Sequence, residues 1–186
     1  MTEKEIDIKI KKVIENYKQN LKEFQKIGFN NEQIRELWIG LEHNVDISEY
    51  ADLKFDHLQM KEIRKGLEDK LDISKYVKPE FDWKQMHLIR VDLKWDKDVS
   101  KYADPKFNYN QMWEICIGLD KGLNVDVYAD PKFDWTEMRE IRYGLEAGVD
   151  VIKYADSDFD WKQMAEIRKD LKAEKSVEKK EPEMEI

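Results

Sequence analysis

The most reactive side chains in this sequence are one cysteine and three histidines: Cys116, His43, His57 and His87. A nucleophilic cysteine needs a base within hydrogen-bond reach. The three histidines occupy different positions of a 26-residue repeat, so we do not expect them to converge on the cysteine. The sequence therefore predicts no catalytic residue and no enzyme, and Cys116 is interpreted as a structural thiol.

The stretch from Asp156 to Asp160 resembles the first half of a calcium-binding loop. Such a loop requires a glycine at its sixth position and a glutamate at its twelfth. This chain has Trp161 and Ile167 there. We interpret the stretch as a turn followed by a helix N-cap, and we predict no metal site and no cofactor.

Charged and aromatic residues also recur in columns, one residue per repeat. The arginines are Arg64, Arg90, Arg142 and Arg168, and the glutamates are Glu62, Glu114, Glu140 and Glu166. An arginine column can bind a ligand, but pairing with the carboxylates of the adjacent repeat is the favoured interpretation. The aromatic column is Trp83, Tyr109, Trp135 and Trp161. It is interpreted as packing between repeats rather than as a platform for nucleic-acid bases.

A tandem repeat must position all of these residues. A tyrosine recurs every 26 residues, at Tyr50, Tyr76, Tyr102, Tyr128 and Tyr154. Self-similarity at such a period is typical of arrays in which each unit buries its apolar face against its neighbours. The sequence therefore predicts an all-α fold, an α-solenoid of six 26-residue repeats with an N-terminal capping helix.

Each repeat has a clear helix start. An Asn or Asp precedes a Gln or Glu by three residues, as in Asp56 and Gln59, which is the spacing of a capping box. A phenylalanine before the cap and a methionine or isoleucine inside the helix, such as Phe55 and Met60, have the spacing of a hydrophobic staple. Apolar residues then follow at helical spacing. Six repeats carry this pattern.

Glycines mark two further places in the repeat. Gly40, Gly66, Gly118 and Gly144 lie within the expected helices. Glycine there costs about 1 kcal/mol relative to alanine. Its recurrence indicates close approach of a second helix, and a merely weak, kinked helix is the alternative. Gly122 and Gly148 are placed to end helices in the left-handed conformation.

The domain boundaries follow from the repeat. Residues 1–23 form the expected capping helix, although the alternation from Ile6 to Ile10 leaves a short strand as an alternative. Residues 24–171 hold the six repeats. Residues 172–186 are mostly Glu and Lys and lack apolar periodicity, so we expect a charged, disordered tail or a frayed helix end.

Composition limits the function. The chain of 186 residues has a formal net charge of −8, which disfavours direct nucleic-acid binding because that depends on clustered Lys and Arg. No apolar run approaches the ~20 residues that span a bilayer, and the first residues lack the apolar stretch of a secretory signal. We therefore expect a cytoplasmic protein without membrane contact. The oligomeric state is left open.

The repeat pattern reads Tyr-Ala-Asp-Pro-x-Phe-Asp-Trp-x-Gln-Met-x-Glu-Ile-Arg-x-Gly-Leu-x-x-Gly-x-Asp-Val. Over about residues 24–171 it resembles short helical repeats associated with Firmicutes and their phages and mobile elements. The resemblance implies a bacterial or phage setting and an α-helical array. It carries no implied activity, and it raises the possibility of a role in phage–host conflict.

Departures from the repeat indicate where a partner binds. Apolar or aromatic residues replace lysine or other polar groups at Val91, Trp95, Trp113, Ile117 and Tyr143. Helical spacing places Val91 with Trp95, and Trp113 with Ile117, on one face of their helices. Stacking of the repeats would join these faces into one apolar strip, and such strips mark partner sites. Coverage of the strip by the N-terminal segment, or internal packing around Asp92, is the alternative.

Three functions remain open. The first is a non-enzymatic repeat protein that binds another protein through one face, as an inhibitor in phage or mobile-element conflict with host defence. The second is an acidic nucleic-acid mimic that blocks a DNA- or RNA-binding protein. The third and weakest is an enzyme or a small-ligand sponge. Salt dependence separates the first two, because mimicry weakens steeply with added salt.

Overall fold

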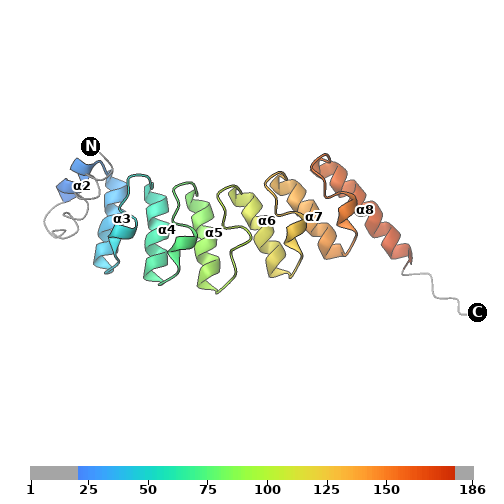
Figure 1. The fold of residues 1–186 in the computed structure, drawn as a ribbon, viewed down its shortest axis with the longest axis horizontal. Coiled ribbons are helices and arrows are strands. Elements are labelled where there is room, and N and C mark those ends of the chain that lie inside the picture. Colours follow the sequence, from blue (N-terminus) through green and yellow to red (C-terminus); the bar gives the residue numbers. More distant parts are fainter. Residues whose placement is uncertain (1–20, 179–186) are drawn as a thin grey trace, which may run out of the picture. The chain divides into compact units, whose positions relative to one another are not determined.

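A computed structural model describes residues 21–178 (Figure 1). All regular structure in that range is helical, with seven α-helices, four short 3-10 turns and no strand. The all-α prediction is therefore confirmed. The expected capping helix over residues 1–23 lies outside the described residues except for its last three, which belong to α2.

The chain forms two compact units, divided between Asp98 and Val99. In the first unit the elements are α2 (Leu21–Ile27), α3 (Asn31–Glu42), η2 (Ile47–Glu49), α4 (His57–Glu68), η3 (Ile73–Lys75) and α5 (Trp83–Lys94). In the second they are α6 (Tyr109–Asp120), η4 (Val125–Val127), α7 (Trp135–Ala147), η5 (Val151–Lys153) and α8 (Trp161–Glu178).

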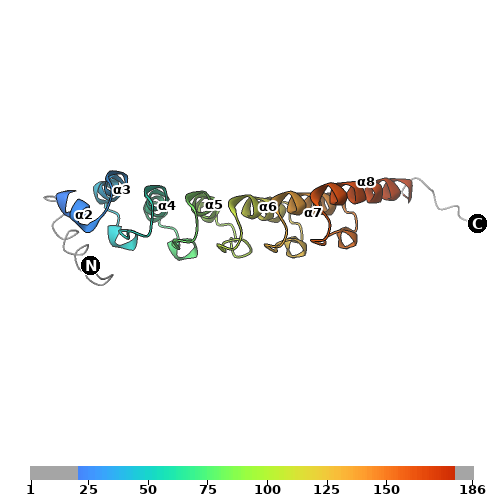
Figure 2. The same ribbon diagram turned by 90° about the horizontal axis from the view of Figure 1, so that it is seen from above.

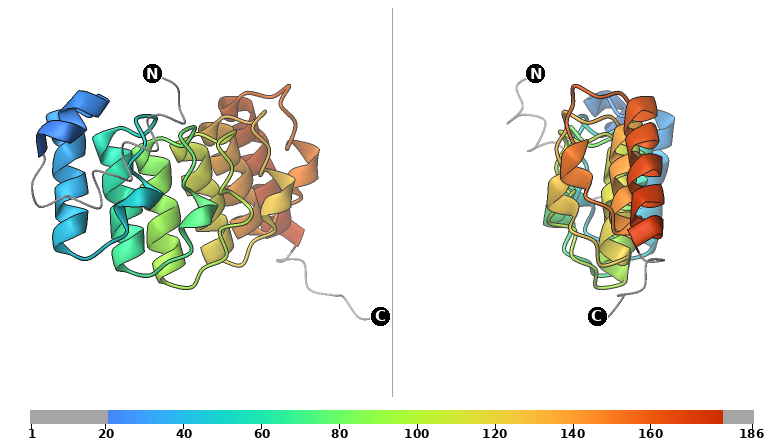
Figure 3. Two further views of the ribbon diagram at one scale, coloured as in Figure 1. Left: turned by 60° about the vertical axis from the view of Figure 1, so that its left-hand side comes forward. Right: turned by 90° about the vertical axis from the view of Figure 1, so that its right-hand side faces the viewer.

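Within each unit, long helices that follow one another pack side by side. In the first unit α4 lies between α3 and α5, and in the second α7 lies between α6 and α8. The short 3-10 turns lie along the opposite side of each unit (Figures 2 and 3). Each unit thus has a helix layer and a turn layer, and the long helices keep one side free of the turns.

Capping boxes start the helices as the sequence predicts. In α4 the Asp56 carboxylate accepts from the backbone N–H of Gln59 at 2.8 Å, and the Gln59 side chain accepts from the Asp56 N–H at 2.8 Å. The same reciprocal pair opens α3, α5, α6, α7 and α8. These pairs satisfy backbone donors that an uncapped helix end would leave without a partner.

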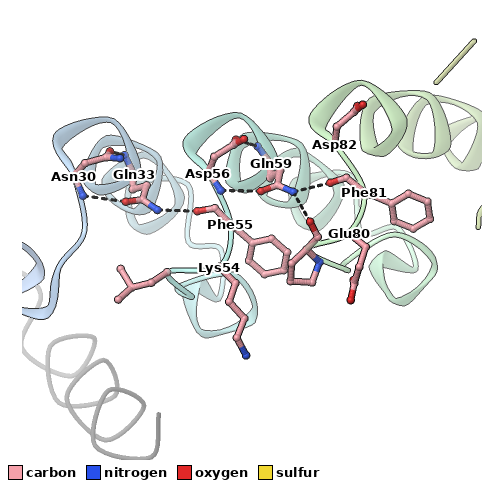
Figure 4. Close-up of a pocket in the computed structure, with 11 residues that line it drawn as sticks. Asn30, Gln33, Lys54, Phe55, Asp56, Gln59, Glu80, Phe81 and Asp82 are labelled. Carbon is pink, nitrogen blue, oxygen red and sulfur yellow. Dashed lines mark hydrogen bonds between the residues drawn. The ribbon is translucent and has the colours of Figure 1, made fainter. Parts of the chain in front are cut away.

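The capping glutamine has a second contact that the sequence did not reveal. The Gln59 side-chain amide donates to the backbone carbonyl of Phe81, in the next repeat, at 2.6 Å (Figure 4). Gln33 and Gln111 reach Phe55 and Phe133 in the same way. One side chain therefore closes its own helix and also binds the following repeat.

The staple residues form the core. Phe81, Met86, Phe133 and Met138 are all buried, as are Phe107 and Met112. The buried phenylalanine fixes the direction in which the chain enters the helix, and the methionine packs beneath the first turn. Phe159, which precedes the last helix, is only half-buried.

The helical glycines confirm the prediction of close approach, but the approaching group is a tyrosine ring rather than a second helix. A Cβ atom added to Gly118 would collide with the hydroxyl of Tyr128. Tyr50, Tyr76 and Tyr154 cover Gly40, Gly66 and Gly144 in the same manner. Each tyrosine follows the glycine by ten residues and belongs to the short turn after the helix.

Buried hydrogen bonds fix these tyrosines. The Tyr128 hydroxyl donates to the Glu114 carbonyl at 3.1 Å, and the Tyr50 hydroxyl donates to the Glu36 carbonyl at 3.1 Å. Burial raises the pKa of Tyr154 to about 12, because the charged phenolate would lose its contact with water. The tyrosine of the repeat is therefore a neutral core residue.

Left-handed residues end the long helices. Gly122 and Gly148 take φ values of 67° and 65°, as predicted. Asn44, Lys70 and Asp96 take the equivalent place in the first unit with φ from 55° to 57°. Non-glycine residues seldom adopt this conformation, so the surrounding repeat imposes it.

The last helix is longer than the sequence indicated. It continues to Glu178, so residues 172–178 are a helix end, the second of the two alternatives, and the rest of the tail lies outside the described residues. Lys175 donates to the backbone carbonyls of Ala147 and Gly148 at the end of α7. Ala, Glu and Lys are good helix formers, and the lysine contact anchors the extension.

Candidate functional site

The arginine and glutamate columns form a ladder of buried ion pairs. The Arg142 guanidinium in α7 donates to the Glu114 carboxylate in α6 at 2.8 Å, and both side chains are almost fully buried. The equivalent pairs are Arg64 with Glu36, Arg90 with Glu62, and Arg168 with Glu140. This confirms the pairing interpretation, so these arginines serve the fold rather than a ligand.

Additional carboxylates complete the ladder. Arg142 also pairs with Glu146 one turn further along α7, and Lys121 reaches Glu146 at 2.7 Å. Burial would raise the pKa of Glu62, but the hydrogen bonds from Arg90 and His87 outweigh it, so the pKa lies below its usual value. Glu62 therefore stays charged beside Arg90, and removing one partner of such a pair would strand a buried charge.

Two of the histidines bind glutamates of this ladder. His43 Nδ1 lies 2.7 Å from Glu68, and His87 Nδ1 lies 3.0 Å from Glu62. Cys116 is buried on α6. Among residues 21–178, no three His, Cys, Asp or Glu side chains gather as metal coordination would require.

Asp156 accepts from the backbone of Asp158, and Asp160 caps α8. These contacts match the interpretation of the stretch as a turn followed by an N-cap.

A shallow groove of about 490 Å³ lies at the N-terminal ends of α3, α4 and α5 (Figure 4). Its lining includes Asn30, Gln33, Asp56, Gln59 and Asp82, which are capping residues already bound to the backbone. The groove is therefore a consequence of the repeat geometry, because the residues that cap successive helices line it.

The tryptophans of the aromatic column are partly exposed, and their packing between repeats stays a prediction. Trp83 and Trp135 are each 37% exposed, and Trp161 is 40% exposed. A cation lies over each of the three tryptophan rings: Lys84 over Trp83, Arg139 over Trp135 and Lys162 over Trp161. The first helical position lies on the exposed side of the helix start, next to an exposed capping residue.

The second unit holds three of the predicted binding residues. Trp113 and Ile117 lie on α6, and Tyr143 lies on α7 at the repeat position of Ile117. Trp113 is 46% exposed, Tyr143 is 38% exposed and Ile117 is half-buried. Because α6 and α7 pack side by side, these residues share one outer face of the helix layer.

The first unit holds the other two. Val91 is half-buried in α5, and Trp95, which caps the end of that helix, is 74% exposed. They lie four residues apart on one side of α5. They form a patch of their own on the first unit.

Two residues that the sequence analysis did not assign to the apolar strip, Tyr109 and Arg139, belong to the same face of α6 and α7. Tyr109 stacks on Trp113 with ring centroids 6.4 Å apart. Arg139 lies over the Trp135 ring, 5.0 Å from its centre. Arg139 occupies the repeat position of Trp113, where Arg35 and Lys61 are also basic, so comparison across repeats does not distinguish it.

Arg139 differs from the ladder arginines in its bonding. Its Nε is buried without a hydrogen-bond partner, and its ion pair in residues 21–178 is with Glu140 of its own helix at 4.0 Å. That glutamate already accepts two bonds from Arg168, at 2.8 and 3.0 Å. The Arg139 guanidinium therefore retains unused donor capacity on an aromatic surface.

Searches against protein-family models, curated proteins and solved structures return no match for this chain. Within the described residues, no helix combines the length and the apolarity that crossing a membrane requires.

Proposed function

We propose that this chain is a non-enzymatic protein of six 26-residue repeats, an α-solenoid that binds another protein through the outer face of its helix layer. The strongest candidate surface is the α6–α7 face, defined by Tyr109, Trp113, Ile117, Arg139 and Tyr143. Val91 and Trp95 form a second candidate patch on α5. The expected setting is the cytoplasm of a bacterium, with a role in phage or mobile-element conflict.

The exposure of Trp113 carries this proposal. At 46% it is one of the most exposed large apolar side chains in the second unit, and it replaces Lys61 of the equivalent helix in the first unit. Exposed apolar patches commonly mark binding sites, and Trp, Tyr and Arg are the residues most often found as interface hot spots. Other side chains of α6 and α7, such as Met112 and Met138, form the buried core beneath this face, so Trp113 is not needed to complete it.

The test is selection from a display library of bacterial and phage protein fragments on the immobilised full chain. Fragments that bind the wild type should lose more than about tenfold in affinity for Trp113→Ala, since about 1.4 kcal/mol corresponds to tenfold. Lys61→Ala changes the equivalent position of α4 and serves as the matched control. If wild type and Trp113→Ala bind the selected fragments equally well, this face is not the binding surface.

The net charge of −8 favours a second candidate function, an acidic nucleic-acid mimic. In that case the partner is a basic protein, and affinity falls steeply as salt is raised. Binding through Trp113 and Ile117 depends mainly on apolar burial and falls only weakly. Titration of any selected fragment at two salt concentrations separates the two functions.

A further inference from the structure

We propose that the α6–α7 face binds an acidic, apolar peptide segment of a partner protein, with Arg139 holding a carboxylate between the aromatic rings. This inference rests on the proposed function, because it specifies the partner chemistry of the same face. It adds Arg139 as a specificity-determining residue to a surface otherwise defined by its apolar side chains.

The aromatic side chains of this face are held in place before any partner arrives. Tyr109 and Trp113 stack one turn apart on α6. The guanidinium groups of Arg142 and Arg168 lie 4.6 and 5.5 Å from the centre of the Tyr143 ring. Ring faces attract cations, so Tyr143 is fixed by two residues of the buried ladder. A fixed aromatic surface loses little conformational entropy on binding.

The charges on this face favour an anion. The ladder neutralises the nearby carboxylates, because Glu114 binds Arg142, Glu140 binds Arg168, and Glu146 binds Arg142 and Lys121. Arg139 adds a positive charge whose carboxylate neighbours are already bound: Glu140, 4.0 Å away, accepts from Arg168, and Asp134, whose pKa Arg139 helps to lower, caps α7. On α8, Lys169 occupies the repeat position of Tyr143 and adds a charge of the same sign.

The unused donors of Arg139 suit a carboxylate in particular. A guanidinium offers five N–H donors in a planar fork that matches a carboxylate with two parallel bonds. The ring of Trp135 supports one side of that fork. A phosphate backbone would also fit the fork, but its many charges would meet the acidic surface of the chain as a whole, which has a net charge of −8. A single carboxylate flanked by apolar residues avoids that repulsion.

The experiment is selection of a random peptide library displayed on phage against the immobilised full chain, with wild type, Trp113→Ala, Arg139→Gln and Arg139→Lys compared. Circular dichroism first verifies that each variant is folded. We expect wild type to enrich peptides that combine Asp or Glu with apolar residues. Arg139→Gln should weaken the enriched peptides about tenfold or more, and Arg139→Lys should weaken them less, because it keeps the charge but loses the fork.

Two outcomes would overturn this inference while leaving the proposed function intact. One is enrichment that depends on Trp113 but shows no acidic preference. The other is enrichment of acidic peptides whose affinity is unchanged by Arg139→Gln. If wild type and Trp113→Ala retain the same peptides, or neither retains any, the proposed function fails as well.

Two further measurements exclude other occupants of this face. Binding of a single-stranded oligothymidine probe that requires Trp113 would identify the occupant as nucleic acid and overturn the inference. A wild-type dimer in light scattering that becomes a monomer in Trp113→Ala would identify a second copy of this chain and overturn it too. We expect no binding of the oligonucleotide and no effect of Trp113→Ala on the mass.

Discussion

Helices α4 and α6 occur at equivalent places in the repeats of the two units. Their buried sides carry the same residues, whereas their outer sides differ. On the buried side they share a glutamine, a methionine, a glutamate, an isoleucine and a glycine in the same order. On the outer side α4 carries His57, Lys61 and Lys65, whereas α6 carries Tyr109, Trp113 and Ile117. The core of the repeat is constant, and its outer face changes from basic to aromatic.

This difference separates the residues that make the fold from those available for function. A buried residue can serve two contacts at once: Glu114 accepts from Tyr128 through its carbonyl and from Arg142 through its carboxylate. Substitution there breaks several bonds at once. Lys61 and Trp113 instead meet solvent, so that position can change without cost to the array. The predictions below test this division, from the largest expected effect to the smallest.

Removing a charge from the buried ladder should have the largest effect. Arg142→Met leaves the Glu114 carboxylate buried without its partner, which costs about 3–5 kcal/mol in comparable cases. Urea denaturation monitored by circular dichroism measures the loss. A destabilisation below about 1 kcal/mol would contradict the account of the ladder.

The chain itself offers the matched control for that substitution. In one case the repeat has neither partner of the ion pair. Leu88 stands at the glutamate position, Cys116 stands at the arginine position of the following repeat, and both residues are buried. The double variant Glu114→Leu with Arg142→Cys copies these residue types. It should recover most of the stability lost by Arg142→Met, because apolar replacement of a whole buried ion pair is often close to neutral.

Truncation of a staple residue, Met112→Ala, is expected to cause the second-largest loss of stability. Met112 is fully buried, and a large-to-alanine change in a core costs roughly 2–5 kcal/mol. Lys106→Ala, at a nearby exposed position, should stay within about 0.5 kcal/mol. Equal shifts in the urea midpoint for the two variants would contradict the assignment of the staple to the core.

A methyl group at the tyrosine contact should cost less. Gly118→Ala forces its Cβ against the Tyr128 hydroxyl, and overpacking of this kind costs about 1–3 kcal/mol. The better helix propensity of alanine offsets about 1 kcal/mol of that. The cost should shrink in a Tyr128→Phe background, since the hydroxyl is the colliding group. Strict additivity in that double-mutant cycle would show that the contact is absent.

The capping residue of α7 provides a smaller, pH-dependent test. Glu137 replaces the glutamine that in α6 donates to the carbonyl of the next phenylalanine, and a carboxylate cannot donate that bond. Burial, together with the charges of Asp134 and Asp160, raises the pKa of Glu137. Because the folded state holds this proton more tightly, Glu137 favours folding at low pH, and this contribution is lost as the pH rises through the raised pKa.

Glu137→Gln should therefore stabilise the chain at neutral pH, by on the order of 1 kcal/mol for one recovered hydrogen bond. The gain should diminish as the pH is lowered into the range where Glu137 takes up its proton. Thermal denaturation of both proteins across that range tests the prediction. A gain that is constant with pH would show that the carboxylate is not the cause.

Most of the local structure followed from the sequence because capping and staple residues act over three to five positions. Asp56 with Gln59, and Phe55 with Met60, are sufficient to place the start of a helix. The ladder was also predictable, since recurring Arg and Glu columns have few partners other than each other. The close approach at Gly118 was attributed to a second helix and is made by Tyr128, because sequence spacing does not show which group fills the space beside a glycine.

The outer face was only partly predictable. Exchanges of lysine for tryptophan and isoleucine identified Trp113 and Ile117, because they break the repeat visibly. Arg139 passed unnoticed because Arg35 and Lys61 carry the same charge at that repeat position. Its distinguishing property, a buried Nε without a hydrogen-bond partner, depends on the packing of Trp135 and on which carboxylates the other arginines already occupy.

The most direct test of the central claim is the affinity of Trp113→Ala for a fragment selected by the wild type, measured by equilibrium titration. The account predicts a loss of more than about tenfold, no effect of Lys61→Ala, and an unfolding free energy within about 1.5 kcal/mol of wild type, the scale of one aromatic pair. An unchanged affinity, or a Trp113→Ala variant that unfolds, would contradict it and place Trp113 in the core.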